Sequence, residues 1–267
     1  MNPSVSSESV NLALLIGFVV IVTLAATYVK WPARCCRLNF IGESIPVVYG
    51  VVPALALSTL MILEHPTGWS ACMLVGGYCF IGLLDDMFGS GAYRGIRGHL
   101  TALRGGVVTT GLIKLVASPV MAAIYVMCTF GMDNWKAYVY ITMIAASSNV
   151  FNLLDLRPGR SQGFAILVLL AVLPFIPTSL VLAAVLILTI TIIPDARARV
   201  MIGDAGAIAI GCTLALVVIA SSNMTLCVAY TVITVGINLV TEKYSLGKLI
   251  TGNHVLRKLD GLMGRRS

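Results

Sequence analysis

Apolar stretches that approach the length of a bilayer recur along the whole chain, and they constrain the fold more than any other feature. A transmembrane helix needs about 17–25 mostly apolar residues. We identify nine candidate stretches, at 10–29, 46–64, 69–84, 107–128, 136–154, 162–176, 178–194, 206–221 and 224–241. Only 11% of the residues are charged, against about 25% in soluble domains. The sequence therefore predicts an all-α, polytopic transmembrane helix bundle of about nine spans.

The basic residues predict how this bundle lies in the membrane. If the N-terminus is outside, the inner segments are 30–45, 85–106, 155–161, 195–205 and the tail from 242, and they hold 16 of the 18 Lys and Arg residues. Because cytoplasmic loops carry an excess of Lys and Arg, we expect the N-terminus outside and the C-terminus in the cytoplasm. Anionic headgroups also account for the net charge of +7, which requires no nucleic acid.

Polar residues are distributed unevenly between the two predicted sides. No linker or low-complexity segment divides the chain, so residues 1–267 are expected to form one integral membrane domain. The predicted outer connections, such as EHPTGW and GMDNWK, are short, whereas almost every cluster of Asp, Arg, Asn and Gly falls on the inner side. This asymmetry favours an enzyme that joins a soluble cytoplasmic substrate to a membrane-bound one.

Two adjacent aspartates, Asp85 and Asp86, end the third apolar stretch in FIGLLDDMFG. Carboxylates at a helix end suit Mg²⁺, which prefers oxygen ligands and is often shared with substrate phosphates. Ionisable residues at membrane depth are generally functional. The alternative is a solvated interfacial pair that only marks the end of a span.

A second polar group lies in SSNVFNLLDLRPGR, where Asn149, Asn152 and Asp155 recur at every third residue. On a continuing helix these side chains form a polar stripe. The alternative use of such amides is hydrogen bonding between transmembrane helices. Arg157 and Arg160 follow; they are either phosphate-binding groups with forked hydrogen bonds or ordinary charges of an inner loop.

The third acidic position is Asp204, which lies between glycines in MIGDAG, directly before the eighth stretch. Small residues let the backbone approach a ligand closely, and the N-terminus of the following helix offers free N–H groups to anions. Lys114 lies about 7 residues, or roughly 10 Å, into the fourth stretch. Its alternatives are neutralisation of the acidic face, binding of a lipid phosphate, or extension of its stem to the interface.

Taken together, these motifs resemble the polyprenyl-phosphate phosphosugar transferases, a family that includes phospho-MurNAc-pentapeptide transferase. The resemblance lies in the order and spacing of three motifs: Asp85-Asp86, then Asn149, Asn152 and Asp155, then Gly203, Asp204 and Gly206. The segment ESIPVVYG is similar to the Thr-Pro-x-x-Gly-Gly segment of the family, aligned on Pro46 and Gly50. The match covers most of the chain.

The resemblance implies transfer of a sugar-1-phosphate from a nucleotide sugar, of the UDP-N-acetylhexosamine type, to polyprenyl (undecaprenyl) phosphate. It implies Mg²⁺, with Mn²⁺ as an alternative, held by Asp86 and Asp204, while Asp85 orients or deprotonates the lipid phosphate. Donor positioning is expected from Asn149, Asn152 and Asp155. The remaining candidate substrate-binding residues are Lys114, Arg97, His99, Arg157 and Arg160.

The same resemblance implies a bacterial plasma membrane enzyme of cell-envelope glycan synthesis, with its site on the cytoplasmic face; a homodimer is left open. The chain departs from the family where Pro158 replaces the second Asp of Asp-Gly-x-Asp-Gly, and only His254 follows the last span in place of a His-rich loop. Two other readings are kept: a membrane transporter that couples cations through the acidic cluster, and an inactive homologue that binds polyprenyl phosphate.

Overall fold

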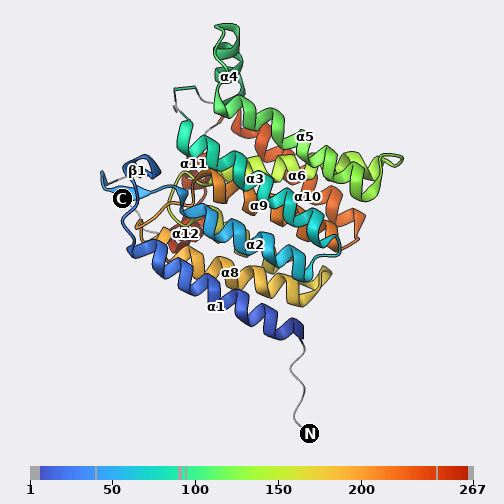
Figure 1. Ribbon diagram of the computed structural model, residues 1–267. Helices are drawn as coiled ribbons and strands as arrows, with labels where there is room; N and C mark the ends of the chain where they lie inside the picture. The colour runs from blue at the N-terminus through green and yellow to red at the C-terminus, as the bar shows by residue number, and fades with distance from the viewer. Residues whose placement is uncertain (1–6, 40, 90–91, 94, 245, 264–267) are drawn as a thin grey trace.

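The molecule is a bundle of helices whose axes run roughly in the same line, some in one direction and some in the other (Figure 1). The computed structural model describes residues 7–39, 41–89, 92–93, 95–244 and 246–263. About 79% of the chain is helical, which confirms the all-α prediction. Together with the length and apolar composition of its helices, this defines a helical membrane protein.

Each of the nine predicted stretches corresponds to a helix. In chain order these are α1 (Ser7–Tyr28), α2 (Val51–Glu64), α3 (Gly68–Phe88), α5 (Thr110–Phe130), α6 (Trp135–Leu154), α7 (Arg160–Val172), α8 (Thr178–Ala196), α9 (Gly203–Ala220) and α10 (Met224–Thr241). Among the described residues, seven helices are long and apolar enough to cross a membrane. The count of nine spans is therefore not confirmed, because α2 and α7 rise only about 20 Å against a hydrocarbon core of about 30 Å.

Shorter elements were not predicted from the hydrophobic pattern. They are the turns η1 (Ala33–Cys35), η2 (Val48–Gly50) and η3 (Leu173–Phe175), the strands β1 (Cys36–Leu38) and β2 (Ser44–Pro46), and the helices α4 (Gly95–Arg104), α11 (Leu246–Gly252) and α12 (His254–Met263). The two strands pair antiparallel, with Arg37 opposite Ile45. Helix α4 projects from the bundle beside the start of α5 (Figure 1).

Helix α9 forms the centre of the bundle. It packs against α2, α3, α6 and α7, and 89% of its apolar window is buried, compared with 17% in α5 and in α10. Small residues allow this close packing: a Cβ at Gly211 would lie 2.6 Å from the Ser147 carbonyl oxygen of α6. The exposed apolar faces of α5 and α10 are therefore the surfaces available to lipid.

Several helices begin at a residue whose side chain caps the helix N-terminus, at the boundary between a loop and an apolar stretch. The side chains of Thr109, Asn134 and Asn223 accept hydrogen bonds from backbone N–H groups in the first turns of α5, α6 and α10. Such caps satisfy donors that have no partner within the helix. They fix where α5 begins, and hence where Thr110 and Lys114 lie.

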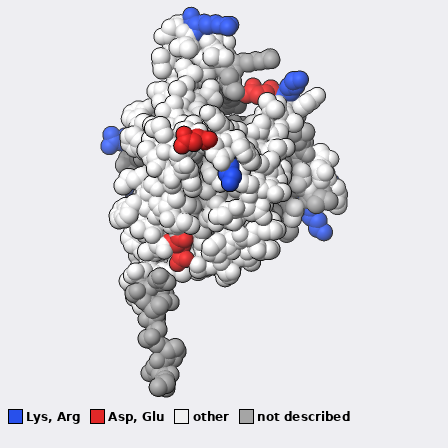
Figure 2. All heavy atoms as spheres, turned by 90° about the vertical axis from the view of Figure 1, so that its right-hand side faces the viewer, with Lys and Arg blue, Asp and Glu red and all other residues white. Residues whose placement is uncertain are grey.

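The two ends of the bundle differ in the connections that they carry. At one end, short turns link α2 to α3, α5 to α6, η3 to α8, and α9 to α10. Figure 2 looks at the side of the molecule on the right of Figure 1, where these turns lie, and shows only scattered charged side chains. The hairpin β1–β2, α11 and α12 lie at the other end (Figure 1). The three polar motifs of the sequence lie at that second end.

Candidate functional site

Three helices bring polar side chains together at the end of the bundle that carries the hairpin. The last turn of α3 supplies Asp85 and Asp86, the first turns of α5 supply Thr110 and Lys114, and the first turn of α9 supplies Asp204. These groups line a pocket of about 250 Å³. The first and third motifs of the sequence therefore converge, although Asp85 and Asp204 are more than a hundred residues apart.

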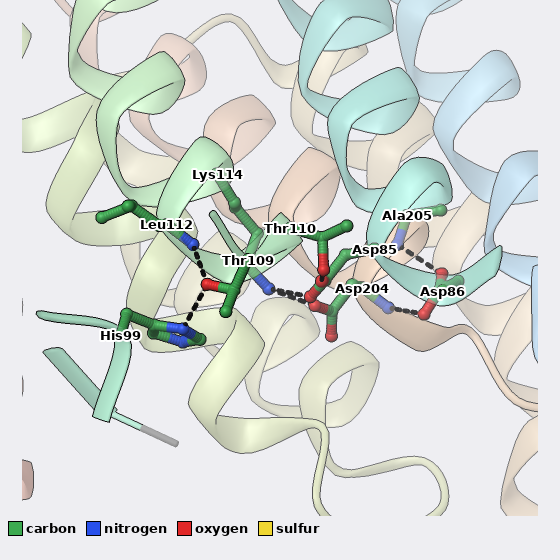
Figure 3. A network of polar contacts seen from close by, with 9 residues as sticks. All are labelled: Asp85, Asp86, His99, Thr109, Thr110, Leu112, Lys114, Asp204 and Ala205. Atoms are coloured by element: carbon green, nitrogen blue, oxygen red, sulfur yellow. Dashed lines mark hydrogen bonds and ion pairs between the residues drawn. The ribbon is translucent and has the colours of Figure 1, made fainter. Parts of the chain in front are cut away.

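Lys114 lies at the centre of the cluster (Figure 3). Its Nζ is 2.9 Å from Asp85 Oδ2 and also forms an ion pair with Asp204 Oδ2; the three side chains retain only 16%, 19% and 27% of their exposure. Thr110 Oγ1 donates to Asp85 Oδ1. Of the alternatives for Lys114, the arrangement matches neutralisation of the acidic face rather than extension toward solvent.

Asn152 joins this cluster from the last turns of α6. With its amide nitrogen directed at Asp204, it donates to Asp204 Oδ1 at 2.7 Å, and its oxygen accepts from Lys114 Nζ at 3.3 Å. That orientation is assigned from the hydrogen-bond partners. One amide thus links the second motif of the sequence to the third.

Asp86 has a different set of partners from Asp85. Its carboxylate oxygens accept hydrogen bonds from the backbone N–H groups of Asp204 and Ala205, both at 2.9 Å. A carboxylate at this position satisfies free donors of α9 and complements the positive end of the helix dipole. Arg37 of β1 donates to the Asp86 carbonyl oxygen at 2.9 Å. Asp86 therefore holds the start of α9 against the end of α3.

Glycines permit this close approach of α3 and α9. Gly203 has φ +55°, and a Cβ there would lie 2.6 Å from Asp86 Oδ2. A Cβ at Gly82 would lie 2.5 Å from the Asp204 carbonyl oxygen, and one at Gly50 only 1.8 Å from the Ile202 carbonyl oxygen. Since no side chain fits at these distances, the three glycines let the backbones and the Asp86 carboxylate come into close contact.

His99 reaches the same pocket from α4. Its Nδ1 lies 2.8 Å from Thr109 Oγ1, and its ring packs against Gly111, where a Cβ would come within 2.3 Å. The pocket is also lined by Arg37 and Tyr93, which the sequence motifs did not single out. The side chain of Arg97, a predicted phosphate-binding residue, lies outside the described part of the structure.

Asn149 and Asp155 flank Asn152 but have other surroundings. Asn149 donates to Asn238 of α10, the contact between helices that the sequence left open as its alternative role. No hydrogen bond or ion pair joins the Asp155 side chain to another described residue. Asp155 keeps some exposed surface. Desolvation of its carboxyl group nevertheless raises its pKa well above the ordinary range, and the negative charge of Asp195 adds to this effect.

The two arginines of the RPGR loop do not join the pocket. Arg160 is 1% exposed and binds Asp260 of α12 through Nε and Nη2, at 2.6 and 3.0 Å. Arg157 Nη1 lies 3.8 Å from the same carboxylate. The expectation that Arg160 grips a substrate phosphate does not fit this geometry, because its guanidinium is already paired in the interior.

Asp195 is a buried acidic residue that the motifs also missed. It is 2% exposed, and its Oδ2 accepts hydrogen bonds from the Gly159 N–H at 2.9 Å and from Gln162 Nε2 at 3.3 Å. It thereby fixes the turn between α6 and α7. Its position in PDARAR, among exposed loop charges, offered no signal of this burial.

The acidic residues supply oxygen ligands without forming a closed metal site. Within the described ranges, no three His, Cys, Asp or Glu side chains are arranged to hold a metal ion. Asp85 and Asp204 share a cation, the Lys114 ammonium group. Asp86, which the sequence paired with Asp204 as a metal ligand, faces the backbone of α9.

The fold and the site define a class: a polytopic helical membrane protein with a polar, charge-balanced pocket at one end. Compared with known proteins, the chain matches no family model and no curated protein.

Proposed function

We propose that the protein is a membrane-embedded transferase that moves a sugar-1-phosphate from a nucleotide sugar to polyprenyl phosphate and releases a nucleoside monophosphate. The observation that carries this proposal is the convergence of Asp85, Asn152 and Asp204 around Lys114. These residues belong to the three motifs that resemble the phosphosugar transferases. The three motifs, which the resemblance identifies by their order along the chain, are therefore in contact with one another in the folded protein.

The orientation forms part of the proposal. With the N-terminus outside, the pocket opens to the cytoplasm, where nucleotide sugars are found, and the acceptor lipid arrives from the bilayer. A donor of the UDP-N-acetylhexosamine type, a bacterial plasma membrane and a role in cell-envelope glycan synthesis follow from the family resemblance. The resemblance leaves a homodimer open.

The pocket suits a hard divalent cation, Mg²⁺ or Mn²⁺. Mg²⁺ is usually bound by one or two carboxylates together with waters and substrate phosphates, and Asp85 and Asp204 already share a cation at their Oδ2 atoms. We therefore assign the metal to Asp85 and Asp204 rather than to Asp86 and Asp204. When bound, the ion neutralises charge on the donor diphosphate.

The residues of the chain itself then bind and orient two anions. A phosphate oxygen of the lipid attacks the sugar-linked phosphorus of the donor; a new P–O bond forms, and the bond to the nucleoside monophosphate breaks. Because both reactants are negatively charged, catalysis consists mainly of positioning and charge neutralisation. Lys114 is the cation nearest the carboxylates, while Arg37 and His99 line the wall of the pocket and would contact the phosphates.

The test is a reconstituted assay. Purified protein in detergent is incubated with undecaprenyl phosphate, Mg²⁺ and a panel of nucleotide sugars, and the released nucleoside monophosphate is measured. We expect release that requires both the lipid and the metal, that falls at least a hundredfold in Asp204→Asn, and that is unchanged in Asp133→Asn, an exposed acidic residue at the opposite end. Folded protein that is silent across the panel would overturn the proposal in favour of lipid binding or transport.

A further inference from the structure

An apolar groove of about 440 Å³ lies between α7, α8 and α12, away from the pocket described above. Its walls are formed largely by Ile166, Leu167, Ile192, Ile193, Leu259 and Met263, and Arg197 lies at one end. The volume falls within the usual range of ligand pockets, about 300–1,000 Å³. Leu167 and Ile193 are exposed large apolar residues, so the groove opens at the surface of helices in the apolar part of the bundle.

Helix α12 is a firmly attached wall of this groove. Its inward stripe consists of Leu256, Leu259, Asp260 and Met263, at the i, i+3, i+4 and i+7 positions of an amphipathic helix, while Arg257 and Lys258 are exposed. Asp260 holds the helix to α7 through the buried Arg160. The groove is thus bounded by a fixed element.

Close packing at the start of α7 reinforces that attachment. A Cβ at Gly163 would lie 2.6 Å from Met263 Cγ, and one at Gly159 would lie 2.2 Å from the Met263 carbonyl oxygen. Both glycines therefore let α12 lie directly on the backbone of α7. The width of the groove is set by these contacts.

The charge at the end of the groove is positive. Arg197 follows the last residue of α8 and is exposed; its backbone N–H donates to the Asp195 carbonyl oxygen, whereas its guanidinium forms no hydrogen bond or ion pair with another described residue. Arg157, in the connection between α6 and α7, lies 3.8 Å from Asp260, whose charge is already paired with Arg160. An apolar channel that ends at an unpaired guanidinium complements a molecule with a long apolar chain and an anionic head.

We propose that this groove binds an anionic phospholipid of the bilayer, with one acyl chain between α7, α8 and α12 and its phosphate on Arg197. A basic residue near the membrane surface strengthens binding of anionic lipid, and a guanidinium forms forked hydrogen bonds with phosphate. The site is separate from the pocket around Lys114, and its occupation does not depend on the transferase activity proposed above.

The experiment is photo-crosslinking of the full-length protein in nanodiscs of phosphatidylcholine. A trace of phosphatidylglycerol with a photoreactive acyl chain is added, and the labelled peptides are mapped by mass spectrometry. We expect adducts in the segments 163–167, 192–197 and 259–263. Arg197→Gln should reduce them about fivefold, the effect of one basic residue at the membrane surface. Leu167→Trp, which fills the groove from an exposed position, should reduce them without changing the charge.

Arg199→Gln is the matched control, because Arg199 is exposed two residues further along and does not line the groove. Equal losses in Arg197→Gln and Arg199→Gln would overturn the proposal, since attraction would then be general. Equal labelling by a phosphatidylcholine analogue, or displacement by undecaprenyl phosphate but not by phosphatidylglycerol, would also overturn it. Labelling confined to other segments would overturn the proposal as well, because the groove would then have a different occupant, such as a second copy of the chain.

Discussion

Replacing Lys114 by Met removes the cation that two carboxylates share. The Nζ atom lies 2.9 Å from Asp85 Oδ2 and contacts Asp204 Oδ2, with all three side chains less than a third exposed. Removing one partner of a fully buried pair costs about 3–5 kcal/mol. Partial exposure, and the bonds from Thr110 and Asn152 that remain, lower the expected loss in the free energy of unfolding to about 2–3 kcal/mol.

Thermal unfolding of the purified protein, followed by tryptophan fluorescence, measures this loss. A loss of that size lowers the midpoint by about 4–12 °C. The control is Lys136→Met, which removes an exposed lysine at the other end and should leave the midpoint within about 1 °C, as surface substitutions do. Added Mg²⁺ should raise the midpoint more in Lys114→Met than in the wild type, because the two carboxylates are then free to bind it.

A double-mutant cycle with Asp85→Asn isolates the ion pair. Removing the carboxylate should destabilise the wild type but have little effect, or a favourable one, in the Lys114→Met background. Additive effects, or a Lys114→Met midpoint equal to that of Lys136→Met, would refute the view that Lys114 balances the charge of the cluster.

Three further predictions concern other contacts. Gly203→Ala should destabilise the protein by at least about 2 kcal/mol, because φ is +55° and the new Cβ meets the Asp86 carboxylate; thermal unfolding measures it. Asp260→Asn should cost about 3–5 kcal/mol, since the buried Arg160 loses its ionised partner; limited proteolysis should then cleave the C-terminal segment. Burial lowers the pKa of His65, so the unfolded chain binds its proton first, and stability should fall below about pH 6.5, by at most about 1.4 kcal/mol per pH unit.

Each of these predictions has a control in the chain. Gly236→Ala adds a Cβ where nothing lies within 4 Å, so it should be neutral or stabilising. Asp133→Asn removes an exposed aspartate and should not change proteolysis. His65→Gln should flatten the stability profile below pH 6.5; a profile as steep as that of the wild type would contradict the assignment to His65.

The apolar runs predicted the helices well because hydropathy is a property of whole segments. All nine helices appear near their predicted bounds, and α10 has the expected range of 224–241. The count of spans was less predictable, since the apolar composition continues through the turn η2 before α2 and the turn η3 after α7. The hairpin β1–β2, the amphipathic helices α4 and α12, and the short helix α11 are elements stabilised by contacts with the bundle, which no hydrophobic run reveals.

The sequence predicted which residues form the site, but it did not predict which contacts they make with one another. The motifs predicted that Asp85, Asp204 and Asn152 belong to one site, and these residues do lie together around Lys114. The division of roles between Asp85 and Asp86 was not predictable, because the two residues are chemically identical and differ only in which side of α3 they occupy. Pairs such as Arg160 and Asp260 lie 100 residues apart and share no local pattern.

The burial of α9 has a consequence for how this sequence tolerates change. Residues on α5 and α10 that face lipid are constrained by polarity alone, so one large apolar side chain replaces another at little cost. Residues on α9 are constrained by volume, because helices lie against them on several sides. Exchange of Ala207 or Ala209 for Leu would keep the hydropathy and still fail to fit. In a library of random apolar substitutions, α9 should therefore be the helix that accepts the fewest.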